Sequence, residues 1–180
     1  MNSYNPLTIK YDQPPGFLFE EDFMEDNIRC IPMLVRFKLD AAGIKLKLAE
    51  WSKFSVDERN QLAIQQCDTD EEIVVYKNYL QQLVKFRSGN QPTVLQLIQD
   101  PAWANLEKVD ESLLAKASEY DWTISVEQWK RLSDLQRFAL LKLYRPGHEN
   151  KNFPKAMKEF GLADEKCIKK AAMKSYCTSE

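Results

Sequence analysis

The spacing of apolar residues along the chain predicts a protein built mainly from α-helices. In the clearest segment, apolar side chains at positions 73, 76, 80, 83 and 84 recur at the interval of one helical face. Similar patterns and boundary residues predict helices at about 32–42, 55–66, 111–120, 134–144 and 153–160, with a short helical turn after Pro101. Strand-like alternation is confined to residues 44–48 and 123–126, and each run is too short to form a sheet alone. The predicted fold class is all-α.

Several helix ends are marked by residues with a defined capping role. Thr69 followed three residues later by Glu72 has the form of a capping box, in which each side chain accepts a hydrogen bond from the other residue's backbone. Asp110 is placed to cap the helix at 111–120. Gly43, Gly89 and Gly161 follow apolar-periodic segments and are expected to end them, because glycine adopts the left-handed conformation that stops a helix.

The two halves of the chain share a pattern when the sequence is shifted by 78 residues. Six positions carry it: Trp51 aligns with Trp129, Phe54 with Leu132, Ser55 with Ser133, Glu58 with Gln136, Arg59 with Arg137, and Leu62 with Leu140. The serines with Glu58 and Gln136 form two further capping boxes, and the tryptophans are expected core anchors. We therefore predict two tandem pseudo-repeats, at about 28–88 and 110–161, that pack against each other through their tryptophans. Each is a helix, a short extended link, a short helix and a longer helix, and together they form one compact helical domain at 17–162.

Arg59 and Arg137 have two interpretations. Repetition within a duplicated unit favours a packing role, in which each arginine makes a repeated surface or interhelix ion pair. The alternative is a pseudo-symmetric pair that holds a carboxylate or phosphate, because a planar guanidinium binds such groups at two points.

Composition and charge exclude several classes of protein. The chain has 180 residues, with 25 Lys and Arg against 27 Asp and Glu, so a formal net charge of −2 provides no general attraction to nucleic acid. No uncharged apolar stretch approaches the roughly 20 residues of a membrane span, and the N-terminus lacks a secretion signal, so we expect a cytoplasmic protein. Residues 1–16 are predicted to form a flexible arm. Residues 163–180 are predicted to form a basic terminal helix, either a solvated tail or a docking element for an acidic partner.

The cysteines and the single histidine limit the possible chemistry. The four cysteines, at 30, 67, 167 and 177, include no Cys-x-x-Cys pair, and one histidine cannot supply a zinc site that needs two or three. No glycine-rich phosphate or dinucleotide motif is present. We therefore expect free thiols and no metal or cofactor. General acid/base catalysis by His148, with Cys30 or Cys67 as nucleophile, is the enzymatic alternative.

The segment 145–153 has the highest density of polar groups between two predicted helices. Pro146 and Gly147 end one helix, and Asn152 is placed to cap the next. One interpretation is that His148, Asn150 and Asn152 bind backbone groups at the two helix ends. The other is a recognition loop on a helical scaffold.

Several blocks in one order give the chain a specific resemblance. They are FLFEEDFMEDNIRCIPMLVRFKLD at 17–40, GIKL at 43–46, CDTDEEI at 67–73, EQW at 127–129, LQRFAL at 135–140, RPGHEN at 145–150 and EFGL at 159–162. Over residues 17–162 the chain resembles the nitrate reductase-associated protein family.

The resemblance implies a role and a partner. Members are linked to the activity or maturation of the cytosolic, molybdenum-dependent assimilatory nitrate reductase, and no catalytic activity is implied. We therefore expect a non-enzymatic accessory factor that binds the nitrate reductase polypeptide or its assembly intermediate, with no membrane or nucleic-acid partner. A helical interaction module for an unrelated acidic partner is a further alternative. The two most characteristic stretches contain the expected contact residues: Arg29, Cys30, Pro32, Arg36, Arg145, Gly147, His148, Glu149 and Asn150.

Overall fold

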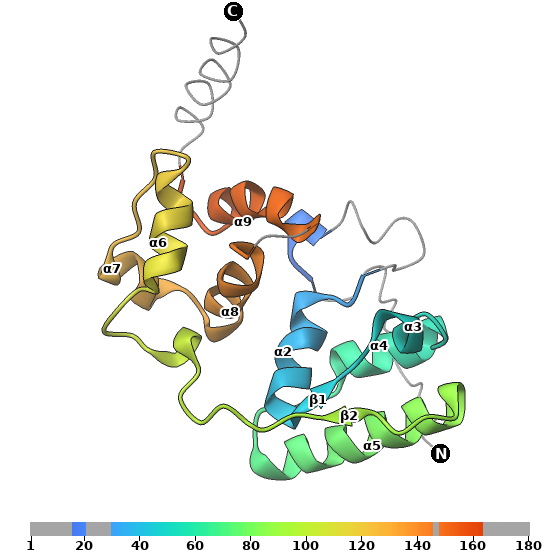
Figure 1. Ribbon diagram of the computed structural model, residues 1–180. Coiled ribbons are helices and arrows are strands. Elements are labelled where there is room, and N and C mark those ends of the chain that lie inside the picture. The colour runs from blue at the N-terminus through green and yellow to red at the C-terminus, as the bar shows by residue number, and fades with distance from the viewer. Residues whose placement is uncertain (1–15, 21–29, 146–147, 164–180) are drawn as a thin grey trace, which may run out of the picture.

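The computed structural model describes residues 16–20, 30–145 and 148–163, apart from the side chains of His148 and Glu149. The described part of the chain is mainly α-helical, which confirms the predicted class (Figure 1). Its α-helices are α2 (Met33–Ala42), α3 (Leu48–Trp51), α4 (Val56–Ile64), α5 (Asp70–Ser88), α6 (Glu111–Ser118), α7 (Val126–Arg131), α8 (Asp134–Leu143) and α9 (Phe153–Glu159). Short 3-10 helices are η1 (Leu18–Glu20), η2 (Ala102–Ala104) and η3 (His148–Asn152). The predicted N-terminal arm, except Gly16, and the predicted basic terminal helix, except Ala163, lie outside the described residues.

The predicted capping residues lie at the ends of the helices. The Thr69 hydroxyl accepts from the Glu72 N–H at 3.2 Å, and the Glu72 carboxylate accepts from the Thr69 N–H at 3.0 Å, so α5 begins with the expected capping box. Asp110 accepts from the Leu113 N–H at 3.0 Å at the start of α6. Gly43 and Gly89 end α2 and α5 in the left-handed conformation. Local sequence therefore determines these boundaries.

The strand predictions need correction. The first run becomes the two-residue strand β1 (Ile44–Lys45), and its antiparallel partner is β2 (Thr93–Val94), which the alternation did not indicate. The second run, 123–126, forms no strand: Ser125 accepts from the Gln128 N–H at 3.1 Å and starts α7 through a further capping box. A strand requires a neighbouring backbone, and the capping interaction satisfies the donors at the start of α7 instead.

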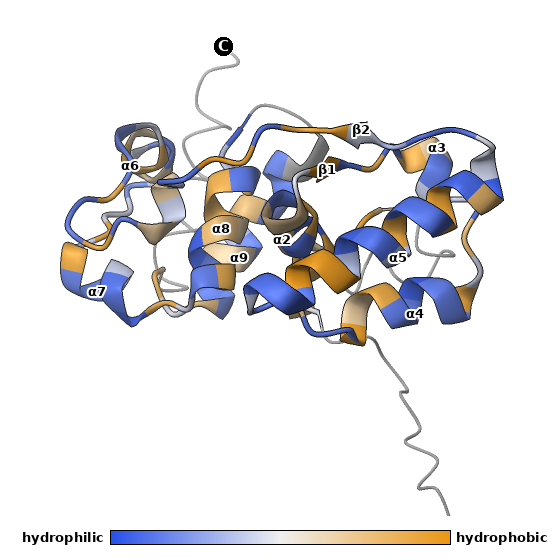
Figure 2. Ribbon diagram, turned by 90° about the horizontal axis from the view of Figure 1, so that it is seen from below, coloured by the Kyte–Doolittle hydropathy of each residue, from blue (hydrophilic) through white to orange (hydrophobic). Residues whose placement is uncertain are grey.

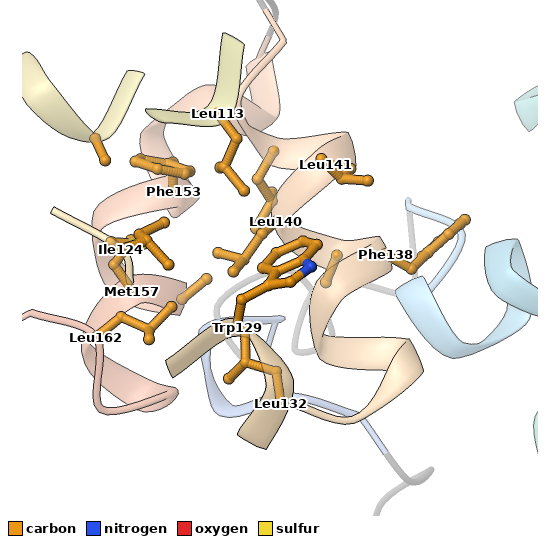
Figure 3. Packing of buried hydrophobic residues seen from close by; sticks show 14 of the residues in the cluster. Leu113, Ile124, Trp129, Leu132, Phe138, Leu140, Leu141, Phe153, Met157 and Leu162 are labelled. Carbon is orange, nitrogen blue, oxygen red and sulfur yellow. The ribbon is translucent and has the colours of Figure 1, made fainter. Parts of the chain in front are cut away.

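Buried apolar side chains form two core clusters, and α2 lies between them (Figure 1). The α6–α9 cluster is built mainly by α6, α7, α8 and α9, with Trp129 among Leu132, Leu140 and Met157 (Figure 3). The α2–α5 cluster is built by α2, α3, α4 and α5. In Figure 2 apolar positions alternate with polar ones along α5, as expected of a helix with one buried face. None of the described helices combines the length and apolar character needed to cross a membrane.

The tryptophans do not pack the two halves together as predicted. Trp51 belongs to the α2–α5 cluster and Trp129 to the α6–α9 cluster, so each anchors its own half. The contact between the halves runs through α2 instead: Met33 joins the α6–α9 cluster, whereas Val35 and Leu39 join the α2–α5 cluster. The apolar pattern of α2 does not reveal that the helix contacts both clusters. Such a pattern shows which positions are buried, but it does not show which cluster each buried side chain joins.

Two glutamates tie the N-terminal segment to the rest of the fold. The Glu159 carboxylate on α9 accepts from the backbone N–H groups of Leu18 and Phe19, at 2.9 and 3.0 Å. Glu20 is buried, and its carboxylate accepts from the Met33 N–H at 2.8 Å, which caps α2 from a segment thirteen residues earlier in the chain. η1 therefore fixes the position of α9 relative to the start of α2.

Candidate functional site

A groove of about 800 Å³ lies where α2, β1 and α8 meet. We call it the α2–β1 groove. Its lining residues are Cys30, Ile31, Arg36, Leu39, Asp40, Ile44, Lys45, Leu46, Leu48, Leu95, Lys142 and Lys151. They come from both predicted repeats and from the segment between them.

The local turn at the end of α2 builds one wall of this groove. Gly43 has φ 63°, which reverses the chain from α2 into β1, and its carbonyl accepts from the Leu95 N–H at 2.8 Å. Pairing of Ile44 with Val94 then places Leu95 in the lining of the groove, which also includes Leu48 at the start of α3. Residues more than fifty positions apart in sequence thus share one wall.

The opposite side is supplied by α8 and η3. The Lys142 ammonium on α8 donates to the Asp40 carboxylate on α2 at 2.8 Å, and it lies 4.8 Å from the centre of the Phe138 ring. Lys151 lines the groove from η3. The Asp40–Lys142 pair therefore joins the two halves at the groove itself.

The described lining of the groove contains charged and apolar side chains. Its charged members are Arg36, Lys45, Lys151 and the Asp40–Lys142 pair, and the other described lining residues are mostly aliphatic.

Only part of the predicted contact set lies at this groove. Cys30, which is half-buried, and Arg36, whose Nε donates to the Ile31 carbonyl at 2.7 Å, both line it. Pro32 is buried at the start of α2 and has a structural position rather than an exposed one.

No described side chain of the second predicted stretch, 145–150, lines the groove. Arg145 is exposed and Asn150 half-buried, and neither belongs to the described lining, whereas the neighbouring Lys151 does. The side chains of His148 and Glu149, together with Arg29 and Gly147, lie outside the described residues. Asn152 occupies the N-cap position of α9 without the expected side-chain capping bond.

Sequence reasoning did not select Asp40, Lys45, Lys142 or Lys151 as contact residues. Asp40 and Lys45 stand in the blocks 17–40 and 43–46 that carry the family resemblance, and Lys151 belongs to the basic segment after position 145. Asp40 and Lys142 are 102 residues apart, so no local pattern connects them.

The paired arginines lie away from the groove and bind backbone carbonyls. Arg137 is buried, and its guanidinium donates to the carbonyls of Trp103, Trp129 and Leu132 and pairs with Asp134. Arg59 donates to the carbonyls of Trp51 and Ser52, at 3.3 and 3.1 Å. Each arginine also lies over the tryptophan eight residues earlier, at 5.5 Å for Arg59 and 5.9 Å for Arg137.

This geometry favours a packing role over docking of a carboxylate or phosphate, because these guanidinium donors are directed at the chain's own carbonyls. The role differs from the expected interhelix ion pair, since the described hydrogen bonds of Arg59 are to carbonyls and the ion pair of Arg137 with Asp134 lies within α8. Ser55 with Glu58 and Ser133 with Gln136 both form their capping boxes. The local motif therefore occurs twice, and duplication of the whole unit stays a prediction.

Cys67 does not meet the requirement for an activated thiol. It is buried in the α2–α5 cluster, and burial raises the pKa of the Cys67 thiol to about 11. A thiol with so high a pKa is protonated at neutral pH and is a poor nucleophile. The hypothesis that His148 acts with Cys67 as nucleophile is therefore not supported, because the Cys67 thiol is not activated.

The fold and the groove together define a mainly α-helical protein with a partly apolar groove between α2, β1 and α8. Comparison with protein families identifies the chain more specifically than the fold does. The family model of the conserved nitrate reductase-associated proteins matches residues 16–160, and the chain belongs to this family. No curated protein and no solved structure matches the chain.

Proposed function

We propose that this protein is a cytoplasmic, non-enzymatic accessory factor for a molybdenum-dependent assimilatory nitrate reductase. It acts by binding the reductase polypeptide, or an assembly intermediate of it, and by stabilising that form or assisting its maturation. The observation that carries the proposal is membership of the nitrate reductase-associated family over residues 16–160. The α2–β1 groove supports it, because Cys30 and Ile31 of the first characteristic stretch line this surface, and so does Lys151, which directly follows the second stretch.

The test is capture of the tagged, full-length protein from its own host grown on nitrate, with bound polypeptides quantified by mass spectrometry. We expect the nitrate reductase polypeptide in a near-stoichiometric ratio to the tagged protein. Growth without molybdate separates two roles: an assembly factor captures more reductase when the cofactor is scarce, whereas a partner of the mature enzyme captures less.

Absence of the reductase from the captured material, in a host that makes it, would contradict the proposal. Recovery of an unrelated acidic protein in stoichiometric amount would instead favour a general interaction module. Arg145→Ala and His148→Ala test the second characteristic stretch directly, and we expect each to weaken capture while leaving the helical content of the protein unchanged.

A further inference from the structure

We infer that η1 is a latch that holds one wall of the α2–β1 groove in place. It lies between α9 and the start of α2 (Figure 1). While η1 is attached to α9, it caps α2, and the residues directly before α2 line the groove. Release of η1 from α9 therefore frees this wall. The inference goes beyond the proposed function, because it concerns the protein alone and does not depend on which ligand the groove binds.

The attachment of η1 to α9 is made by one carboxylate and by aromatic side chains. Glu159 accepts from the backbone N–H groups of Leu18 and Phe19, at 2.9 and 3.0 Å, and the ring of Phe17 lies edge-on to that of Phe160 with centres 4.9 Å apart. Phe19 is buried in the α6–α9 cluster, whereas Leu18 is 67% exposed. Because few of its side chains are buried, a segment of this kind opens at a lower free energy than the whole fold.

Helix α2 takes its N-terminal cap from η1. Its own N-cap residue is Pro32, whose side chain makes no capping bond. By contrast, α4, α5, α6, α7 and α8 each begin with a serine, threonine or aspartate whose side chain accepts from the backbone of the same helix. At α2 the Glu20 carboxylate of η1 accepts from the Met33 N–H at 2.8 Å. Both residues are buried, so release of η1 leaves a buried N–H of α2 without this acceptor.

The groove wall is built on the capped end of α2. Cys30 and Ile31 directly precede this helix and line the groove. The Ile31 carbonyl accepts from Arg36 Nε at 2.7 Å, so the position of the wall depends on the first turns of α2. Loss of the cap loosens those turns, and attachment of η1 is thereby coupled to the accessibility of Cys30. The coupling is reciprocal: a ligand that binds the wall in this conformation also strengthens the attachment of η1 to α9.

Glu159→Ala tests the coupling from a position outside the groove. The substitution removes the acceptor for the backbone of η1 and leaves α2 and the described lining unaltered. The readout is alkylation of the full-length protein by iodoacetamide, followed at each cysteine by peptide mass spectrometry. We expect alkylation of the half-buried Cys30 to become at least about threefold faster, with no change at the buried Cys67. The control is Glu119→Ala, which removes an exposed glutamate after α6 and is expected to change neither rate.

A second variant and a second measurement separate the steps of the coupling. Phe17→Ala loosens the same latch through its aromatic contact instead of its hydrogen bonds. In amide hydrogen exchange followed by NMR, the amides of Leu18 and Phe19 report the attachment of η1, and the amide of Met33 reports the cap of α2. We expect all three amides to exchange faster in both variants, with Cys30 alkylated faster as well.

Three results would overturn the inference. In the first, the amides of Leu18 and Phe19 exchange faster while Met33 and Cys30 are unchanged, so that η1 is a passive contact. In the second, alkylation rises in parallel at Cys30 and Cys67, so that the opening is unfolding of the whole domain. In the third, neither variant changes the exchange of η1. All three results leave the proposed function standing, because that function is tested by capture of the reductase.

Discussion

Tyr76 on α5 is fully buried, and its hydroxyl has no hydrogen-bond partner among the described residues. The nearby Lys38 ammonium, 6.0 Å from the centre of the Tyr76 ring, donates to the carbonyls of Ala63 and Gln65 at 2.6 Å each and so caps the end of α4. Burial raises the pKa of Tyr76 well above its usual range. The hydroxyl group therefore loses its hydration on folding and gains no bond from the described residues in return.

Tyr76→Phe is expected to raise the free energy of unfolding by about 1 kcal/mol, because it removes an unsatisfied buried hydroxyl and keeps the ring. Urea unfolding followed by circular dichroism measures the change. Tyr120→Phe is the control, since Tyr120 is only half-buried and we expect a change within about 0.5 kcal/mol. A loss of stability in Tyr76→Phe would mean that a bound water or a group outside the described residues satisfies the hydroxyl.

At the scale of single elements, the ends of the helices follow from local chemistry, whereas the strands do not. The capping box of Thr69 and Glu72 and the glycine at 89 are complete within a few residues of α5, so sequence alone is sufficient to place its ends. The alternation at 123–126 satisfies a strand pattern but has no neighbouring strand, and Ser125 caps α7 instead. The pairing of β1 with β2 depends on a contact across fifty residues, which no local window contains.

Gly43 and Gly89 end their helices with similar backbone angles, φ 63° and 74°, but their surroundings differ. A Cβ added at Gly89 meets nothing within 4 Å, whereas one at Gly43 comes within 3.0 Å of the Leu95 carbonyl oxygen and 3.1 Å of Leu97 Cδ2. Gly89→Ala therefore carries the backbone penalty alone, and Gly43→Ala adds a clash with the segment that follows β2.

We expect Gly89→Ala to lower the free energy of unfolding by about 1 kcal/mol. Gly43→Ala is expected to cost a further ~1–3 kcal/mol, as overpacking does in other cores. Urea unfolding of the two variants side by side makes the comparison. Equal costs would show that the segment around Leu95 moves away from β1 without loss.

At the scale of the whole molecule, α2 links the two core clusters, each of which is built mainly by one half of the chain. Its Met33 packs in the α6–α9 cluster, its Val35 and Leu39 pack in the α2–α5 cluster, and Asp40 on the same helix pairs with Lys142 of α8. Unfolding of either cluster removes the packing contacts on one side of α2, and this destabilises the cluster that packs on its other side. We therefore propose that residues 17–162 unfold as one cooperative domain.

Scanning calorimetry is expected to show a single transition for the full chain. Leu62→Ala in the α2–α5 cluster and Leu143→Ala in the α6–α9 cluster each truncate a fully buried side chain, which costs about 2–5 kcal/mol. Both variants should lower the midpoint of that one transition. Two transitions, each shifted by only one of the variants, would instead indicate two independent domains.

The sequence by itself determined the helical class, most helix boundaries, the twice-used capping motif and the resemblance that family comparison established. These features are set by interactions within a few residues or by the order of sequence blocks. Only the tertiary structure decided that the two tryptophans lie in separate cores, that β2 pairs with β1, and that Lys45, Lys142 and Lys151 share one groove. Each of these depends on contacts between distant segments, whose formation is governed by packing of the whole chain rather than by any local pattern.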